Sequence, residues 1–327
     1  MDKRKWSSRA LLVATLAAVA LVGPSVAARA QAQGETAGTA PAAPVTLPVG
    51  PRPESITKGW DGKFFVSIQG APDLGLNDGQ IRTFDPATGA TTVFATGLDN
   101  PRGLAFTGKY LVATDTTVVW IIDRTGNKRI LADPAAFPHP IAFFNDAAPE
   151  TGGKAVYVSE MGHRELMRDP ATSRLWPTDS PQALAIPAAS RIYRIGLTGQ
   201  VTEVVTPSRK VLVMNGVTEA NTRGHLLCAE FFYGNVVDVD LRTNRKTIIA
   251  TGFRAMDGIE QGRDGSIYMS SFDNGAIFKV DQDGENPQVL LQGVGFQTTA
   301  DFYLDEKGKR ILQPDTLHGT IIIVSLP

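Results

Sequence analysis

Short apolar runs alternate with turn-forming residues along most of this chain, and the arrangement of the two recurs. The segment "MNGVTEANTRGHLLCAE" begins at Met214. It matches almost letter by letter the segment "MDGIEQGRDGSIYMSS", which begins at Met256. Each segment reads Met, Asn or Asp, Gly and a β-branched residue, followed by a polar turn and a short apolar run. Short apolar runs between Gly, Asp and Asn turns indicate β-strands rather than helices.

The same phrase occurs six times, at intervals of roughly 43 residues where nothing is inserted. Its other copies begin at Pro53, Pro101, Phe144 and Thr299, and one interval is longer because it holds an insertion at residues 162–190. Three or four short strands in a repeat of about 40 to 45 residues are typical of a β-propeller blade. We therefore predict an all-β fold, a six-bladed β-propeller with a central channel. The alternative, a pair of β-sandwiches, would not repeat one phrase six times.

The N-terminal segment differs from the repeats. A basic stretch, "MDKRKWSSR", precedes an apolar run at residues 10–22, and small residues at 28–30 offer a cleavage site. This is the pattern of a secretory signal peptide, and the apolar run is short for a membrane span. We predict a signal peptide at 1–30, a flexible Ala/Gly/Pro-rich linker at 31–44 and the propeller at 45–327.

Export follows from this interpretation. The mature protein is expected to be periplasmic or secreted, with no stable membrane insertion once the signal is removed; an uncleaved N-terminal anchor is the alternative. The segment from Ala43 to Gly50 reads as one more strand. We expect it to join the last blade and lock the two ends of the ring together.

Composition supports a globular protein and excludes some partners. The chain is 43% hydrophobic and 20% charged, as expected for a protein with a real core. Its formal net charge of -1 gives no reason to expect nucleic acid as a partner. Cys228 is the single cysteine and lies in an apolar run, so we expect a buried free thiol and no internal disulfide.

A polar residue stands near the start of every copy, on the strand that should lie nearest the channel axis. These key residues are Glu54, Arg102, Asn145, Asn215, Asp257 and Asp301. Because the inner strands surround one channel, side chains at one register point to one shared place. Several buried carboxylates there would need a cation or protons to offset their charge.

Carboxylate and amide oxygens are the ligands of a hard divalent cation, and they suit calcium best. Neither Cys nor His occupies these positions, which argues against zinc. The repeat thus nominates Glu54, Asn215 and Asp257 as ligands of a divalent cation, foremost Ca²⁺, with Zn²⁺, Mn²⁺ and Mg²⁺ as further candidates. The alternative is that Asp and Asn here only cap tight turns.

Four phrases carry a resemblance to a known family: "RPES" at 52–55, "FND" at 144–146, "MNG" at 214–216 and "MDG" at 256–258. Their order and spacing resemble the senescence marker protein, gluconolactonase and luciferin-regenerating enzyme family. The chain is more distantly similar to paraoxonases and strictosidine-synthase-like propellers. The resemblance covers the chain from about Pro53 to its end, and it implies hydrolysis of lactones at a site that binds one divalent cation.

The resemblance also implies roles for individual residues. It makes Glu54, Asn215 and Asp257 the metal ligands and places Asn145 beside the metal, in contact with metal or substrate. Asp257 inherits the role of general base, which needs a pKa compatible with taking a proton. A cation in such a site polarises the substrate carbonyl and stabilises the developing oxyanion.

The sequence departs from the sugar-lactonase members of this family at Phe143, where they carry an arginine that grips substrate hydroxyls. The run "IAFF" at 141–144 therefore predicts an apolar pocket, ill suited to a polyhydroxylated lactone. Arg102 could supply a cation to substrate from the next blade or hold an inner-strand salt bridge. The insertion at 162–190 is either a lid over the channel mouth or a surface elaboration.

The sequence leaves two functions open. The first is an exported metal-dependent hydrolase, a carboxylic-ester hydrolase of lactonase or esterase type that acts on a small, partly apolar ester or lactone. The second is a non-catalytic exported binding propeller whose divalent cation is structural, since one fold hosts many functions. A lyase or strictosidine-synthase-like activity ranks last because its usual catalytic Glu is not identifiable.

Overall fold

The structure is a computed structural model that describes residues 43–71 and 75–326. The predicted signal peptide at 1–30 and nearly all of the predicted linker lie outside these residues, so both stay predictions. Within the described part of the chain, no helix is long and apolar enough to cross a membrane.

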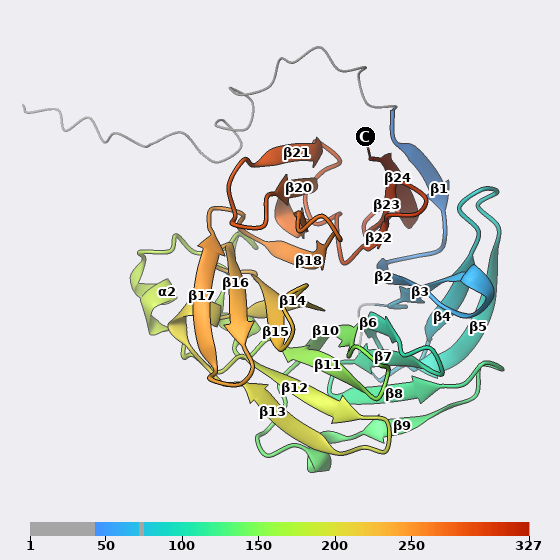
Figure 1. The fold of residues 1–327 in the computed structure, drawn as a ribbon, viewed down its shortest axis with the longest axis horizontal. Helices are drawn as coiled ribbons and strands as arrows, with labels where there is room; N and C mark the ends of the chain where they lie inside the picture. The colour runs from blue at the N-terminus through green and yellow to red at the C-terminus, as the bar shows by residue number, and fades with distance from the viewer. Residues whose placement is uncertain (1–42, 72–74, 327) are drawn as a thin grey trace, which may run out of the picture.

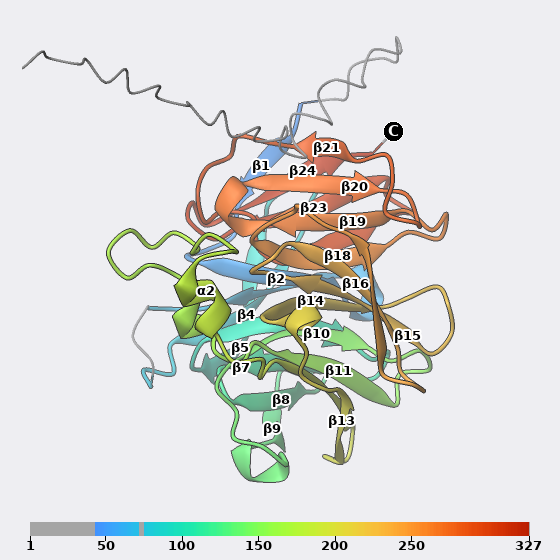
Figure 2. The same cartoon turned by 90° about the vertical axis from the view of Figure 1, so that its left-hand side faces the viewer.

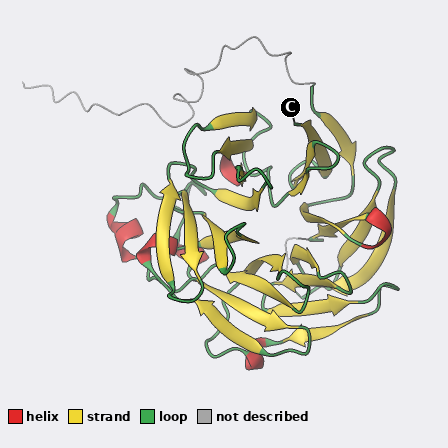
Figure 3. Cartoon of the chain, in the orientation of Figure 1, coloured by secondary structure: helices red, strands yellow, loops and turns green. Residues whose placement is uncertain are grey.

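Six antiparallel sheets of four strands each form a ring around a central channel (Figure 1). Strands dominate and helical segments are few and short (Figure 3). The predicted all-β, six-bladed β-propeller is confirmed. In every blade the strand nearest the channel is the one that opens the corresponding copy of the sequence repeat.

The blades follow the order of the chain. Blade 1 comprises β2 (Pro53–Lys58), β3 (Phe64–Ile68), β4 (Gly79–Phe84) and β5 (Thr91–Leu98). Blade 2 comprises β6 (Pro101–Phe106), β7 (Leu111–Asp115), β8 (Val118–Ile122) and β9 (Lys128–Ala132). Blade 3 comprises β10 (Phe144–Pro149), β11 (Ala155–Glu160), β12 (Arg191–Gly196) and β13 (Val201–Val205).

The second half of the ring is built in the same way. Blade 4 comprises β14 (Met214–Glu219), β15 (His225–Glu230), β16 (Asn235–Asp240) and β17 (Arg245–Ala250). Blade 5 comprises β18 (Met256–Gln261), β19 (Ile267–Ser271), β20 (Ala276–Val280) and β21 (Gln288–Leu291). Blade 6 comprises β22 (Tyr303–Asp305), β23 (Arg310–Asp315), β24 (Thr320–Ser325) and β1 (Val45–Pro48).

The ring closes through pairing of its first and last strands. β1 runs antiparallel to β24, with Val45 opposite Ile323 and Leu47 opposite Ile321. In Figure 1 the blue β1 accordingly lies beside the red β24. The strand predicted between Ala43 and Gly50 therefore does join the last blade, and it covers an edge that β24 would otherwise expose.

Apolar clusters between neighbouring blades form the core. Tyr157 and Ile192 of blade 3, for example, pack with Val217 and Cys228 of blade 4. Because both faces of a blade are covered, a strand such as β3 is buried along its whole length and reads as an apolar run. Cys228 is a fully buried free thiol, as predicted, and burial raises its pKa.

The sixth inner strand differs from its prediction. Thr299 was expected to open it, but Thr299 makes only an isolated bridge to Asp315, and β22 begins at Tyr303. The paired part of this strand is therefore shorter than in the other blades. Thr299 pairs with the last residue of β23, as Pro53 and Phe144 pair with the last residues of β3 and β11. The key residue of the other blades directly follows this opening residue, so in blade 6 that position belongs to Ala300, and Asp301 lies one residue beyond it.

Among the described residues, helical segments are confined to connections between strands. The 3-10 turns are η1 (Trp60–Gly62), η2 (Pro134–Ala136), η3 (Arg164–Leu166), η4 (Arg209–Val211) and η5 (Phe272–Asn274), and the α-helix is α2 (Pro181–Ala185). Both η3 and α2 belong to the insertion, which connects β11 to β12. Figure 2 shows α2 at the left-hand face of the ring. The insertion therefore extends one face of the propeller.

Candidate active site

The key residues of the repeat occupy β-bulges at the start of the inner strands. The pairing of β14 with β15 shifts between Met214 and Val217, so Asn215 and Gly216 lie in the irregular stretch. Register shifts at the equivalent points of β2, β6, β10 and β18 include the residues Glu54, Arg102, Asn145 and Asp257. A bulge turns a side chain away from the regular alternation of a strand, and bulges are common beside active sites.

The glycine after the key residue lets neighbouring inner strands approach closely. A Cβ placed on Gly216 would lie 2.3 Å from the carbonyl oxygen of Asp257, and one placed on Gly258 would lie 2.6 Å from Oδ1 of Asp301. Real Cβ atoms do not make such contacts. The Gly of the "MNG" and "MDG" phrases is therefore required by the closeness of the strands around the axis.

Small hydroxyl side chains on the second strand of the blade support these bulges. Ser270 Oγ accepts a hydrogen bond of 2.8 Å from the backbone N–H of Gly258 and donates one of 2.7 Å to the carbonyl of Ala300. Ser159 Oγ accepts in the same way from the backbone N–H of Asp146 at 2.9 Å. The bulge would otherwise leave these buried N–H groups without a partner.

A cavity of about 440 Å³ opens at the channel mouth. It is lined by all six site residues that the sequence nominated: Glu54, Arg102, Phe143, Asn145, Asn215 and Asp257. Asp301 does not line it. The Asp301 carboxylate instead accepts a 2.6 Å hydrogen bond from Ser55 Oγ. Asp301 stands one residue after the key position of the repeat, which Ala300 occupies, and this removes it from the group.

Four oxygens at the floor of this cavity are buried and have no hydrogen-bond partner within the described residues. They are Oε2 of Glu54, Oδ1 of Asn145, Oδ1 of Asn215 and Oδ1 of Asp257. A buried oxygen without a donor costs free energy, so four in one cavity is an arrangement that needs a positively charged or donating partner. Two carboxylate and two amide oxygens fit a hard divalent cation, and calcium best.

The electrostatics of the floor agree with that fit. Burial, together with the charge of the nearby carboxylate of Asp146, raises the pKa of Asp257 to about 7. Burial, with the negative charge of Asp257, raises the pKa of Glu54 well above its usual range, while Arg102 acts in the opposite direction. Without a cation, the protein thus resists holding both carboxylates ionised.

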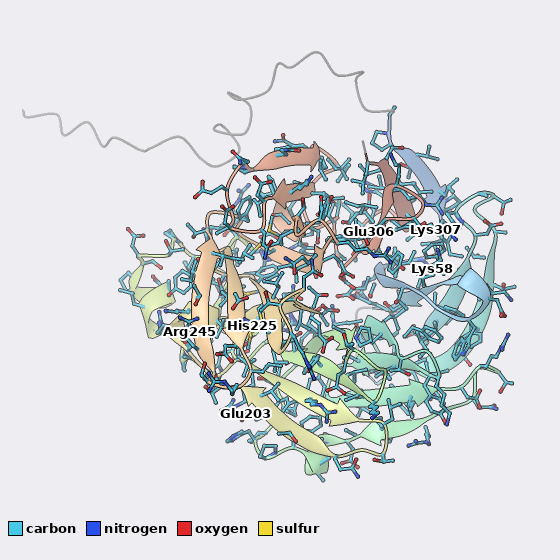
Figure 4. The ribbon with its side chains drawn as sticks, viewed as in Figure 1. Lys58, Glu203, His225, Arg245, Glu306 and Lys307 are labelled. Atoms are coloured by element: carbon cyan, nitrogen blue, oxygen red, sulfur yellow. The ribbon has the colours of Figure 1, made fainter. Side chains whose placement is uncertain are left out.

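The floor differs from a zinc site. Across the described ranges there is no group of three or more His, Cys, Asp and Glu side chains that could hold a metal ion. The proposed ligands include only two such residues, Glu54 and Asp257, because amides supply the other oxygens. None of the four histidines lines the cavity. His225, labelled on β15 in Figure 4, instead pairs with Asp238 at 2.8 Å.

Arg102 lies between the floor and an aromatic wall. Its Nη1 is 3.7 Å from Oε1 of Glu54, and its guanidinium carbon is 4.4 Å from the ring centroid of Phe143. Arg164 lies over the same ring at 3.7 Å. Arg102 therefore forms the inner-strand ion pair that was one of its two predicted roles, and it also borders the cavity.

The prediction of an apolar pocket lined by "IAFF" at 141–144 is wrong in its main part. Only Phe143 of this run lines the cavity, and two guanidinium groups contact its ring. Phe144 is fully buried and packs on Phe137, with 5.0 Å between the ring centroids. Neighbouring residues of an extended chain point to opposite sides, which sends Phe144 into the core.

The insertion borders the cavity, although the sequence left its position open. Arg164, Met167 and Arg168 all contribute to the cavity wall. Arg168 is held by Asp273, with hydrogen bonds of 2.8 and 2.9 Å, and by the carbonyl of Ser173. The segment is thus anchored to blade 5 and forms a fixed part of the mouth.

Sequence reasoning missed three arginines of the mouth, Arg52, Arg164 and Arg168. Arg52 belongs to the "RPES" phrase, so its position two residues before Glu54 was a usable signal. Arg164 and Arg168 carried no such signal in the sequence. They lie in the insertion, which interrupts the repeat, so the repeat does not predict where their side chains point.

The opposite end of the channel has its own polar groups. Lys58, labelled in Figure 4, ends β2 four residues beyond Glu54 and lies 3.4 Å from Oδ1 of Asp305. Arg310 also pairs with Asp305, at 3.1 Å. These charges are therefore matched, in contrast to the unpartnered oxygens at the mouth.

The fold and the position of this cavity define a lactonase-like β-propeller. The chain belongs to the SMP-30/gluconolactonase/LRE-like family, whose model matches residues 76–300, more than half of the chain. Five of the six nominated site residues fall inside the matched segment, and Glu54 precedes it. A search of curated proteins finds no match to this sequence.

Solved structures show the same fold. A gluconolactonase from Xanthomonas campestris, described as important in glucose secondary metabolic pathways, superposes with a TM-score of 0.63. The match covers 87% of this chain and 89% of that one at 15% sequence identity. At this identity the likeness establishes the shared architecture, and the substrate must be argued from the site itself.

Proposed function

We propose that this protein is a metal-dependent carboxylic-ester hydrolase of lactonase type, with its active site in the cavity at the channel mouth. The observation that carries the proposal is the set of four unpartnered oxygens in one cavity of a lactonase-like propeller. Glu54, Asn215 and Asp257 would hold a divalent cation, foremost Ca²⁺, and Asn145 would lie beside it.

The residues of the site have separable tasks in this proposal. When bound, the cation would supply Lewis-acid polarisation of the substrate carbonyl and stabilisation of the oxyanion. The Asp257 carboxylate would act as general base and take a proton from the attacking water at one of its oxygens. Asn145, whose Nδ2 lies 3.3 Å from the sulfur of Met161, would position the substrate or the cation.

The wall of the cavity indicates a partly apolar substrate. Phe143, Met161, Met167, Phe231 and Phe272 line it together with the polar floor. Burial of a hydrocarbon portion against these side chains would contribute roughly 25 cal/mol per Å² of apolar surface. A small ester or lactone with an apolar portion fits such a cavity better than a fully hydroxylated one.

We also propose that the protein is exported and acts in the periplasm or outside the cell. The basic, apolar and small-residue pattern within residues 1–30 supports this proposal. Comparing the N-terminal residue of the protein recovered from the cell envelope or medium with that of the cytoplasmic pool tests it. An intact Met1 in the recovered protein would contradict cleavage.

The hydrolase proposal is tested with a panel of lactones and aryl esters. Turnover is measured with added Ca²⁺, with Mn²⁺, Zn²⁺ or Mg²⁺, and with chelator, for the wild type and for Asp257→Asn. We expect turnover that chelator removes, that a divalent cation restores and that Asp257→Asn abolishes in a folded protein. No metal-dependent turnover on any substrate would favour the alternative, a binding propeller with a structural cation.

A further inference from the structure

The mouth of the cavity carries more positive charge than its neighbours balance. Four arginines line it: Arg52, Arg102, Arg164 and Arg168. Arg168 is neutralised by Asp273 in a two-pronged ion pair, and Arg52 donates to the carbonyl of Gly70 at 2.9 Å. The two that remain, Arg102 and Arg164, both lie over the ring of Phe143.

Arg164 has no partner of its own. Its side chain forms neither an ion pair nor a hydrogen bond with any described residue. The adjacent Glu165 is directed to His163 instead, with 3.0 Å between Oε1 and Nδ1. Its contact with Phe143 at 3.7 Å holds the guanidinium in place through a cation–π interaction without neutralising its charge.

Arg102 is only partly balanced. The distance of 3.7 Å to Glu54 is longer than a hydrogen bond, and Nε of Arg102 is buried without a partner in the described part of the chain. Arg102 and Arg164 both line the cavity. Their guanidinium groups therefore border it with N–H donors that the described residues leave unused.

Partial burial makes this arrangement costly without an anion. Removal from water, together with the positive charge of Arg102, lowers the pKa of Arg164 to about 10. Guanidinium groups bind carboxylate and phosphate with short, charge-assisted hydrogen bonds, which are stronger where water is excluded. The wall thus has the donors, the charge and the low solvation of an oxyanion subsite.

We infer that the substrate of this site carries an oxyanionic group, a carboxylate or a phosphate, bound by Arg164 and Arg102 beside Phe143. This inference rests on the proposed hydrolase function and refines its substrate class. The oxyanion would lie at the arginine wall, the apolar portion against the methionine and phenylalanine side chains, and the ester carbonyl near Asp257. The substrate is then an anionic ester or lactone.

Two matched aryl esters test the inference. The p-nitrophenyl monoester of glutaric acid carries a free carboxylate, and its methyl ester has nearly the same shape without the charge. Arg164→Met keeps an apolar side chain over Phe143 and removes the charge. Arg174→Met is the control, since Arg174 is exposed in the same insertion and does not line the cavity.

We expect the wild type to prefer the anionic ester, and Arg164→Met to lower kcat/KM for that ester by about 10- to 100-fold. The neutral ester should change by less than about threefold, and Arg174→Met should leave both unchanged. Equal effects of Arg164→Met on the two esters, or none on either, would overturn the inference while leaving the hydrolase proposal standing.

A binding measurement separates the two proposals. Glutarate and inorganic phosphate are each titrated calorimetrically into the Ca²⁺-loaded wild type, Arg164→Met and Arg174→Met. If Arg164→Met weakens binding by about tenfold or more and Arg174→Met does not, the result supports the oxyanion subsite. This holds even if neither ester is hydrolysed. The anion that binds more tightly identifies the oxyanionic group as a carboxylate or a phosphate. Binding of neither anion, or binding that does not depend on Arg164, would overturn it.

Discussion

Nη1 of Arg102 lies 3.7 Å from Oε1 of Glu54, while Oε2 of the same carboxylate has no hydrogen-bond partner in the described structure. The Glu54 side chain is 3% exposed and that of Arg102 is 15% exposed. A buried carboxylate with one loosely paired and one unpaired oxygen is incompletely compensated. Asn145, Asn215 and Asp257 each have a buried oxygen without a partner as well. Together these oxygens indicate that a cation is the missing partner.

Calcium should stabilise the protein through Asp257. At about 100 times its Kd, a ligand that binds only the folded state adds about 2.7 kcal/mol of stability, so the wild-type Tm should rise by several degrees. Asp257→Asn should lose this rise, yet in chelator it should be at least as stable as the wild type, because one buried charge is removed. Differential scanning calorimetry measures both. The exposed Asp283→Asn is the control, and equal Ca²⁺ responses in all three proteins would contradict the assignment.

Ser270 should matter to both stability and metal affinity. Ser270→Ala removes the acceptor for the Gly258 N–H and the donor to the Ala300 carbonyl, both buried. The loss should be about 1–3 kcal/mol in the free energy of unfolding. Because this bulge directs Asp257, Ca²⁺ affinity should fall as well. Urea denaturation and calcium titration test this, with the exposed Ser325→Ala as control; a wild-type affinity in Ser270→Ala would refute the coupling.

Glu260 should make stability depend on pH. Burial, together with the charge of Asp146, raises the pKa of Glu260 from 4.5 to about 8. The hydroxyl of Thr218 donates to its carboxylate at 3.2 Å. Between those two pH values the folded state keeps a proton that the unfolded state releases. The stabilising contribution is therefore complete below about pH 4.5 and is lost as pH rises through about 8.

Glu260→Gln keeps an acceptor for Thr218 and cannot ionise. Its free energy of unfolding should fall less between pH 5 and pH 9 than that of the wild type, both measured in chelator. At pH 9 the variant should be the more stable by on the order of 1–3 kcal/mol. Parallel stability curves for the two proteins would show that Glu260 does not carry this dependence.

The pairing of β1 with β24 should be needed for a stable ring. A protein that starts at Gly50 lacks the strand and exposes the edge of β24. It should unfold at a lower temperature, by several degrees or more, and should aggregate more readily. A protein that starts at Ala43 retains the pairing and serves as the control. Equal melting temperatures and equal solubility for the two would mean that closure does not depend on β1.

Much of this fold could be predicted because the blade repeat is written in the sequence. Five inner strands begin at the predicted residues, since Met214, Met256 and their counterparts each precede a bulge and a short apolar strand. The sixth was misplaced. Asp301 is the second residue after Thr299, whereas the key residues of the other blades directly follow the residue that opens their strand. Ala300 holds the key position in blade 6, and the polar residue one position later resembles a key residue in the sequence, although its carboxylate accepts a hydrogen bond from Ser55.

The floor of the site was predictable for the same reason, whereas the wall was not. The same position of the repeat holds Glu54, Asn145, Asn215 and Asp257. Because that position lies on the inner strand of each blade, it determines that their side chains point into one cavity. Arg164 lies in a segment without register, and only the tertiary structure brings it to Phe143. The "IAFF" run misled because hydrophobic identity alone does not tell which side of the chain faces the cavity.

The most direct test is a crystal structure of the Ca²⁺-loaded protein, with the ion identified by its anomalous scattering. We expect one ion at the floor of the cavity, with oxygens of Glu54, Asn215 and Asp257 at about 2.3–2.6 Å and that of Asn145 beside them. A cavity floor without an ion at saturating calcium, or an ion held elsewhere in the molecule, would contradict the assignment of these residues as a metal centre.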